Sequence, residues 1–222
     1  MTRIIVVGGG GHGQVVADVI LSRARLGDNL ELAGFLDDDS ALLGQELLGA
    51  CVLGGVEQLS NIPHDAVVVG IGDNATRARV YDQLRTLGER FAALVHPQAM
   101  LAQHLAIGPG TVVFAGAIIN TGSVVGPNVV INTGATVDHH ANIGAHVHVA
   151  PGVHLGGTVT LGEGVFLGIG SSVIPNRMIG PWTVVGAGAT VLSDLPAGVT
   201  AVGTPARIMK YHLRSSDELT HD

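Results

Sequence analysis

The stretch from Val125 to Leu155, VGPNVVINTGATVDHHANIGAHVHVAPGVHL, decides the fold, because an aliphatic residue returns in it at every sixth position. A helix repeats every 3.6 residues and a strand every two, so a beat of six fits neither alone. It fits one short straight run followed by one turn, and three such runs close a triangular coil. The beat extends over sixteen consecutive aliphatic positions: Val95, Leu101, Ile107, Val113, Ile119, Val125, Ile131, Val137, Ile143, Val149, Leu155, Leu161, Leu167, Val173, Ile179 and Val185.

Composition agrees with a stack of such coils. The chain is 46% hydrophobic but only 3% aromatic, so its interior must be filled by Val, Ile, Leu and Ala in a narrow, regular space. Glycine contributes 33 of 222 residues, which indicates many repeated tight turns. Coils that stack on one another bury a continuous aliphatic column.

The six-residue beat resembles the hexapeptide-repeat family of left-handed parallel β-helices over residues 95–190. The resemblance, and not the period, implies the left-handed sense. Members of that family are commonly acyltransferases that assemble as homotrimers, with acyl-CoA lying between adjacent helices. The resemblance therefore implies a homotrimer with acetyl-CoA as co-substrate, and places the acyltransferase domain and its C-terminal tail at residues 93–222.

Residues 1–92 predict a small Rossmann-like α/β domain with a parallel sheet of the βαβ type. The predicted elements are a strand at 4–7, a helix at 14–22, a second strand ending near Leu36, a third strand at 66–71 and a helix at 74–87. A glycine loop, Gly8-x-Gly10-x-x-Gly13, joins the first strand to the first helix, and Asp37 lies near the distance expected for a ribose ligand. Three interpretations stay open: NAD binding, nucleotide-sugar binding, or a glycine turn without a ligand.

Three segments of the first half, GGGGHGQVVADVI, FLDDD and VGIGDNATR, together with the repeat, narrow the resemblance. The chain is similar to the family of sialic acid O-acetyltransferases and bacillosamine or perosamine N-acetyltransferases. That resemblance implies a nucleotide-linked 4-amino-4,6-dideoxy sugar, carried by UDP or GDP, as acceptor in the synthesis of cell-surface glycan precursors. The residues that it implies for binding this substrate are Gly10, Gly11, His12, Asp37, Asp38, Gly72, Asp73 and Asn74.

The segment VDHHANIG, residues 137–144, matches the catalytic stretch of the family, whose general-base histidine falls on His139. A base is required because the acceptor amine must lose a proton as the C–N bond forms, and histidine titrates near neutral pH. Family members usually carry Glu or Asp directly after this histidine, whereas this chain has His140. Asp138 is an alternative partner for the base, and His140 is itself an alternative base.

The same resemblance places Asn132 in the active site and His148 against acetyl-CoA. Further positions are implied to hold the CoA arm: Gly157, Gly168, Ile169, Ala187 and Pro205. Of the remaining histidines in the repeat, His146 and His154 fall on positions that point outward, and we expect both to be exposed on the surface.

Charge and cysteine content exclude several classes. The net charge of -7 and the absence of a basic run argue against nucleic acid as partner. The apolar runs are short and interrupted by glycine, so no membrane association is expected. The single cysteine, Cys51, allows no internal disulfide and, with no secretory leader recognised, favours the cytoplasm. Because Cys51 lies far in sequence from the histidines, we expect direct acetyl transfer without an acyl-enzyme.

Three alternative functions differ in class. One is O-acetylation of sialic acid or another sugar. Another is a protein that binds a nucleotide sugar without catalysis. The third is a trimeric zinc carbonic anhydrase, whose three histidine ligands include two that are five residues apart. No two of the clustered histidines, 139, 140, 146, 148 and 154, have that separation, so no metal site is expected.

Overall fold

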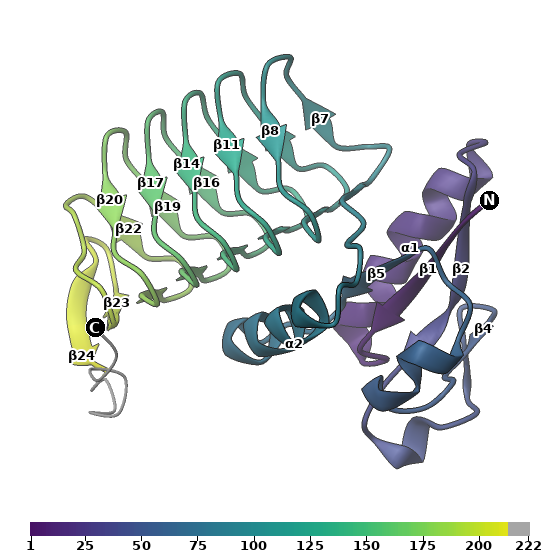
Figure 1. Cartoon of the computed structure of the whole chain (residues 1–222). Helices are drawn as coiled ribbons and strands as arrows, with labels where there is room; N and C mark the ends of the chain where they lie inside the picture. The colour runs from purple at the N-terminus through teal and green to yellow at the C-terminus, as the bar shows by residue number, and fades with distance from the viewer. Residues whose placement is uncertain (213–222) are drawn as a thin grey trace.

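The computed structural model describes residues 1–212 and consists of an α/β domain followed by a parallel β-helix (Figure 1). The first domain holds a three-stranded parallel sheet in the order β2-β1-β5. Its sheet and helices confirm the predicted βαβ pattern, although the first helix begins earlier than expected, inside the glycine loop. The elements are β1 (Thr2–Val7), α1 (Gly11–Arg25), β2 (Leu30–Leu36), η1 (Ser40–Leu42), β3 (Glu46–Leu47), β4 (Ala50–Cys51), η2 (Val56–Asn61), β5 (Ala66–Val69) and α2 (Asn74–Thr86).

Strand β1 is the centre of this sheet because its side chains alternate between two apolar faces. Ile4 and Val6 pack with Val16 and Ile20 of α1, whereas Ile5 and Val7 pack in the cluster that contains Leu84 of α2. A strand places successive side chains on opposite faces, so an uninterrupted apolar run is what a strand covered on both sides requires.

The repeat folds into a three-sided β-helix, in which each aliphatic of the beat pairs with the aliphatic three sextets later, as Ile131 does with Val149. We name its sides the first, second and third face in the order in which the chain visits them. The first face comprises β6 (Leu94–Val95), β9 (Val112–Val113), β12 (Val130–Ile131), β15 (His148–Val149), β18 (Phe166–Leu167), β21 (Val184–Val185), β23 (Val199–Val202) and β24 (Arg207–Tyr211). The second face comprises β7 (Met100–Leu101), β10 (Ile118–Ile119), β13 (Thr136–Val137), β16 (His154–Leu155), β19 (Ser172–Val173) and β22 (Thr190–Val191). The third face comprises β8 (Ala106–Ile107), β11 (Val124–Val125), β14 (Asn142–Ile143), β17 (Thr160–Leu161) and β20 (Met178–Ile179).

The corners of the β-helix require both close stacking of the coils and a left-handed backbone. A Cβ atom on Gly126, which directly follows an inward aliphatic, would lie 2.9 Å from backbone atoms of the next coil, so glycine here permits close stacking. The left-handed backbone conformation occurs at the third residue after an inward aliphatic, at Asn128 with φ 54° after Val125 and at His140 with φ 56° after Val137. Asparagine and histidine tolerate this region better than most side chains.

The first domain docks on the first face of the β-helix. Outward residues of that face are apolar: Leu94, Val112 and Val130 are at most 2% exposed and belong to one cluster with Val16 and Ile20 of α1. Burying this apolar strip against α1 favours docking, at about 25 cal/mol for each Å² removed from water.

Within residues 1–212, no helix combines the length and apolar character that crossing a bilayer requires. The C-terminal tail predicted within residues 93–222 extends beyond residue 212, outside the described residues.

Candidate functional site

The predicted site residues lie at different corners of the β-helix. We call the corner between the first and second faces the first corner, that between the second and third faces the second corner, and that between the third and first faces the third corner. Helix α2 lies against the β-helix (Figure 1) and contacts its third corner through Asn128 and His146. The first domain therefore covers the first face and the third corner.

The glycine loop is held by the carboxylate of Asp37. The N–H of Gly9 donates to Asp37 Oδ2 at 2.7 Å, and the N–H of Asp39 donates to Asp37 Oδ1 at 2.9 Å. Gly10 is the N-cap of α1 without a side-chain cap, and neither Gly10 nor Gly11 has a heavy atom within 4 Å of an added Cβ. The loop thus presents open backbone at a helix N-terminus, which is where phosphates bind in many nucleotide-binding proteins.

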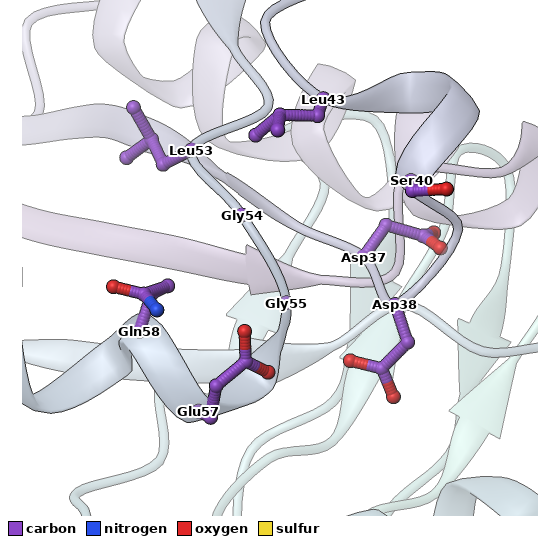
Figure 2. A pocket seen from close by; sticks show the side chains of 9 residues that line it. All are labelled: Asp37, Asp38, Ser40, Leu43, Leu53, Gly54, Gly55, Glu57 and Gln58. Carbon is purple, nitrogen blue, oxygen red and sulfur yellow. The ribbon is translucent and has the colours of Figure 1, made fainter.

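A cavity of about 480 Å³ lies beside Asp37 and Asp38 (Figure 2). Asp38 accepts a hydrogen bond from the N–H of Val56 at 3.0 Å through Oδ1. Sequence reasoning missed Glu57 and Gln58, because they lie in the irregular segment η2, which matches no motif. The lining residues are Asp37, Asp38, Ser40, Leu43, Leu53, Gly54, Gly55, Glu57 and Gln58.

His12, Gly72, Asn132 and His148 come together where the first domain meets the first face. His148 Nδ1 lies 3.3 Å from the Gly72 carbonyl oxygen, and Asn132 Nδ2 lies 3.2 Å from His148 Nε2. The Gly72 oxygen can only accept, so His148 carries its proton on Nδ1 and receives a hydrogen bond from Asn132 on Nε2. The His12 ring centroid is 5.7 Å from that of His148.

Both of these histidines are neutral at pH 7. Burial, and secondarily the charge of Arg77, lowers the pKa of His148 to about 3 and that of His12 to about 4. Among the described residues, His12 Nε2 is a buried nitrogen without a hydrogen-bond partner. The pair therefore offers polar but uncharged contacts and does not compete for protons near neutral pH.

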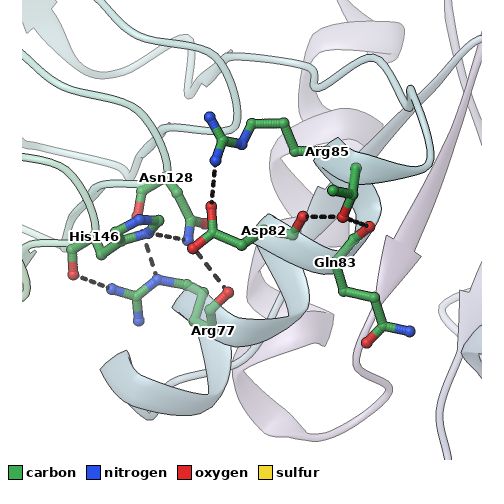
Figure 3. Close-up of polar contacts among 7 residues, drawn as sticks. Arg77, Asp82, Gln83, Arg85, Asn128 and His146 are labelled. Atoms are coloured by element: carbon green, nitrogen blue, oxygen red, sulfur yellow. Dashed lines mark hydrogen bonds and ion pairs between the residues drawn. The ribbon is translucent and has the colours of Figure 1, made fainter. Parts of the chain in front are cut away.

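Arg77 anchors α2 to the third corner (Figure 3). It is 1% exposed and donates to the carbonyl oxygens of Asn128 at 3.3 Å and His146 at 2.8 Å, and to Asn74 Oδ1 at 2.9 Å. Two further bonds reach the Ile71 oxygen at 3.2 Å and the Gly72 oxygen at 3.3 Å. Burial lowers the pKa of Arg77 to about 10, so it stays charged at neutral pH.

Asn74 and His146 also lie at the contact between α2 and the β-helix. The side-chain amide of Asn74 donates to the oxygens of Gly164 at 3.1 Å and Val165 at 3.2 Å, so it points at the β-helix. The expectation that His146 is exposed is wrong: its sextet position does point outward, but α2 covers it and leaves it 6% exposed. His154 is exposed as expected, with Nδ1 2.8 Å from the hydroxyl of Thr136.

A second cavity, of about 360 Å³, opens between the start of α2 and the third corner. Asp73 caps α2 by accepting from the Thr76 N–H at 2.8 Å, and this hydrogen bond lowers the pKa of its carboxyl. The only tryptophan of the sequence, Trp182, forms part of the opposite wall. The lining residues are Gly72, Asp73, Asn74, Ala75, Gly164, Phe166, Trp182 and Val184.

Asp138, His139 and His140 form the second corner, opposite the first face. The ring nitrogens Nδ1 of His139 and His140 are 3.1 Å apart. Asp138 Oδ1 accepts from Asn120 Nδ2 at 2.9 Å and from the N–H of His139 at 2.7 Å. These two hydrogen bonds, with that from Asn120 the larger, lower the pKa of the Asp138 carboxyl and keep it ionised.

The residues predicted to hold CoA are divided between two corners. Gly157 lies at the second corner, where a Cβ atom on it would be 2.6 Å from Cε1 and Nε2 of His139. Gly168, Ile169 and Ala187 follow first-face strands and stack at the first corner, where the Gly188 N–H donates to the Ile169 oxygen at 2.8 Å. Pro205 follows β23 on the same side, and Asn132 follows β12.

Comparison with known proteins decides the family. Residues 3–84 match the family model described as the PglD N-terminal domain. The crystal structure of PerB from Caulobacter crescentus, in complex with CoA and GDP-perosamine, is 38% identical, with a TM-score of 0.85, covering 95% of this chain and 98% of PerB. The chain belongs to the family of bacillosamine and perosamine N-acetyltransferases. The resemblance predicted from the sequence motifs is thereby confirmed.

Two other members of the family support the same assignment. The acetyltransferase domain of PglB from Neisseria gonorrhoeae is 33% identical, with a TM-score of 0.84, covering 94% of this chain and all of that domain; it has also been crystallised with acetyl coenzyme A. A curated relative, the UDP-N-acetylbacillosamine N-acetyltransferase of Bacillus subtilis, is 37% identical over 117 residues. That match spans about half of either chain, 52% of each.

Within residues 1–212, no group of three His, Cys, Asp or Glu side chains is placed to hold a metal ion. Thiolate, imidazole and carboxylate groups are the usual protein ligands of zinc.

Proposed function

We propose that this protein transfers acetyl from acetyl-CoA to the amino group of a nucleotide-linked 4-amino-4,6-dideoxy sugar, with His139 as general base. The nucleotide is UDP or GDP, and the product enters the synthesis of cell-surface glycans. Family membership supports the reaction class, since PerB binds CoA together with GDP-perosamine.

The observation that carries the proposal is the distribution of the site over separate corners. The glycine loop, Asp37 and the His148 cluster lie on the side of the first face, whereas His139 lies at the opposite, second corner. One chain therefore cannot bring its own His139 to its own nucleotide loop. A homotrimer in which the second corner of one subunit meets the first corner of the next would supply both halves of the site.

The chemistry follows from this arrangement. The amine nitrogen attacks the thioester carbon while His139 Nε2 takes the amine proton; the C–S bond then breaks and the proton passes to the departing CoA sulfur. Cys51, the single cysteine, is exposed in strand β4 of the first domain, which supports direct transfer without an acyl-enzyme. CoA lies along the first corner, over Gly168, Ile169, Ala187 and Pro205.

The test is thiol release from acetyl-CoA across UDP-, GDP- and dTDP-linked amino sugars and free sialic acid. We expect release with one nucleotide-linked amino sugar, and a loss in the His139→Ala variant of roughly 100-fold or more. Release with free sialic acid alone would assign O-acetylation instead.

Subunit mixing tests the shared site. Trimers of His139→Ala alone and of Asp37→Ala alone should both be inactive, whereas mixed trimers should regain part of the activity. Activity that never returns on mixing would contradict a site built from two subunits.

A further inference from the structure

We propose that His140 is a positioning residue that fixes the proton of His139 on Nδ1 and so leaves the Nε2 lone pair free for the substrate amine. The proposal rests on the proposed function, because it assigns the base to His139. It gives this chain a second imidazole in the place where its family usually has a carboxylate.

The contact between the two rings carries the proposal. Their Nδ1 atoms are 3.1 Å apart, which is hydrogen-bond distance and requires one nitrogen to donate and the other to accept. If His139 donates, its Nε2 is unprotonated and can act as a base. If His140 donates, His139 carries its proton on Nε2 and cannot. The direction of the hydrogen bond at Nδ1 therefore decides whether Nε2 of His139 can act as a base.

Glycines of the neighbouring coils hold both rings in this arrangement. A Cβ atom on Gly157 would lie 2.6 Å from Cε1 and Nε2 of His139, and one on Gly122 would lie 2.7 Å from Cδ2 of His140. Each ring thus occupies the space that a side chain on the adjacent coil would fill. Both histidines are exposed, so their closest packing is against these two glycines rather than within a buried core.

Asp138 does not fill this role, because among the described residues its carboxylate makes no hydrogen bond to either imidazole ring. Its Oδ1 accepts from Asn120 and from the backbone N–H of His139, so it holds the turn that carries the two histidines. On the neighbouring coils, Gly122 and Thr121 lie on one side of the two histidines and Gly157 lies on the other. None of these three residues titrates, and Asp138 is the charged neighbour of His139 and His140.

The left-handed backbone at His140 allows a matched pair of variants. Glycine and asparagine both accept a φ of 56°, but only asparagine places an oxygen where Nδ1 of His140 lies. We expect His140→Gly to lower kcat roughly 10- to 100-fold, the usual effect of losing the partner that orients a functional histidine, with KM for acetyl-CoA unchanged. His140→Asn should retain most of the activity. His104→Gly, at the same corner with φ 60°, is the control and should behave as wild type.

Nitrogen-15 NMR of histidine-labelled full-length protein gives a readout without catalysis. We expect the Nδ1–H tautomer of His139 in the wild type and in His140→Asn, and a mixture dominated by Nε2–H in His140→Gly. Wild-type kcat in His140→Gly, or an unchanged tautomer, would overturn the proposal. An inactive wild type whose tautomer still depends on residue 140 would instead refute the proposed function and leave the positioning contact standing.

Discussion

Replacing Arg77 by methionine tests how the first domain is fixed to the β-helix. Methionine keeps most of the length but removes every donor, so the oxygens of Asn128 and His146, which accept from Arg77 at 3.3 and 2.8 Å, lose their partner (Figure 3). A buried carbonyl without a donor costs about 1–3 kcal/mol, so the two on the β-helix side predict a loss of about 2–6 kcal/mol in the free energy of undocking. Arg77→Lys should give an intermediate loss, since one ammonium cannot reach all five acceptors.

The single tryptophan provides the assay, because Trp182 lines the cavity beside the start of α2. Urea titration followed by its fluorescence should show an early transition in Arg77→Met that is absent from the wild type. The matched control is Arg85→Met on the same helix, because the Arg85 side chain is 68% exposed and pairs with Asp82 at 3.3 Å. Such an exposed pair contributes about 0–1 kcal/mol. Equal effects of the Arg77 and Arg85 variants would refute the anchoring argument.

Three further predictions concern the site. The pKa values of about 4 for His12 and about 3 for His148 lie below the unfolded value of 6.5, so the unfolded chain takes up protons first as the pH falls. From pH 7 to 5.5 we therefore expect the free energy of unfolding, measured by urea titration, to fall by about 1 kcal/mol for each histidine. In His148→Asn the free energy of unfolding should depend less on pH. Gly157→Ala should displace the His139 ring and lower kcat with an unchanged melting temperature, because only the end of an exposed side chain must move; normal kcat would contradict the contact. Nucleotide-sugar binding should shift Trp182 emission, since its cavity includes Gly72, and acetyl-CoA alone should shift it less.

The sequence predicts which side chains of the β-helix point inward, but it does not predict which of the outward side chains are buried. A six-residue period fixes which side chains point in, and every later aliphatic of the beat is buried, as Ile131 and Val149 are. It does not say which outward side chains another domain will cover. For this reason the sequence predicts an exposed His146 and does not predict its contact with Arg77.

A weaker signal for the docked face is present in the sequence. On the first face the outward position of each strand from Leu94 to Val184 is apolar except His148, whereas the other two faces mix apolar residues such as Ile118 and Val124 with polar ones such as Thr136 and Asn142. An apolar strip that appears on one face in three marks the face that a partner buries. The single histidine in this strip is the buried residue that bonds to Gly72 and Asn132.

The interior of this β-helix is filled by its aliphatic column, so a substrate has no cavity to enter inside the prism. Any site must lie on the outside, where one flat face gives too little contact to hold a long cofactor and a sugar together. The first face and the third corner are already covered by the first domain, which turns them into one wall of a site. The second corner, with His139 and His140, has no such wall in its own chain. The proposed trimer would give each corner its missing wall from a second copy, and acetyl transfer would then take place where the second corner of one subunit faces the docked domain of the next.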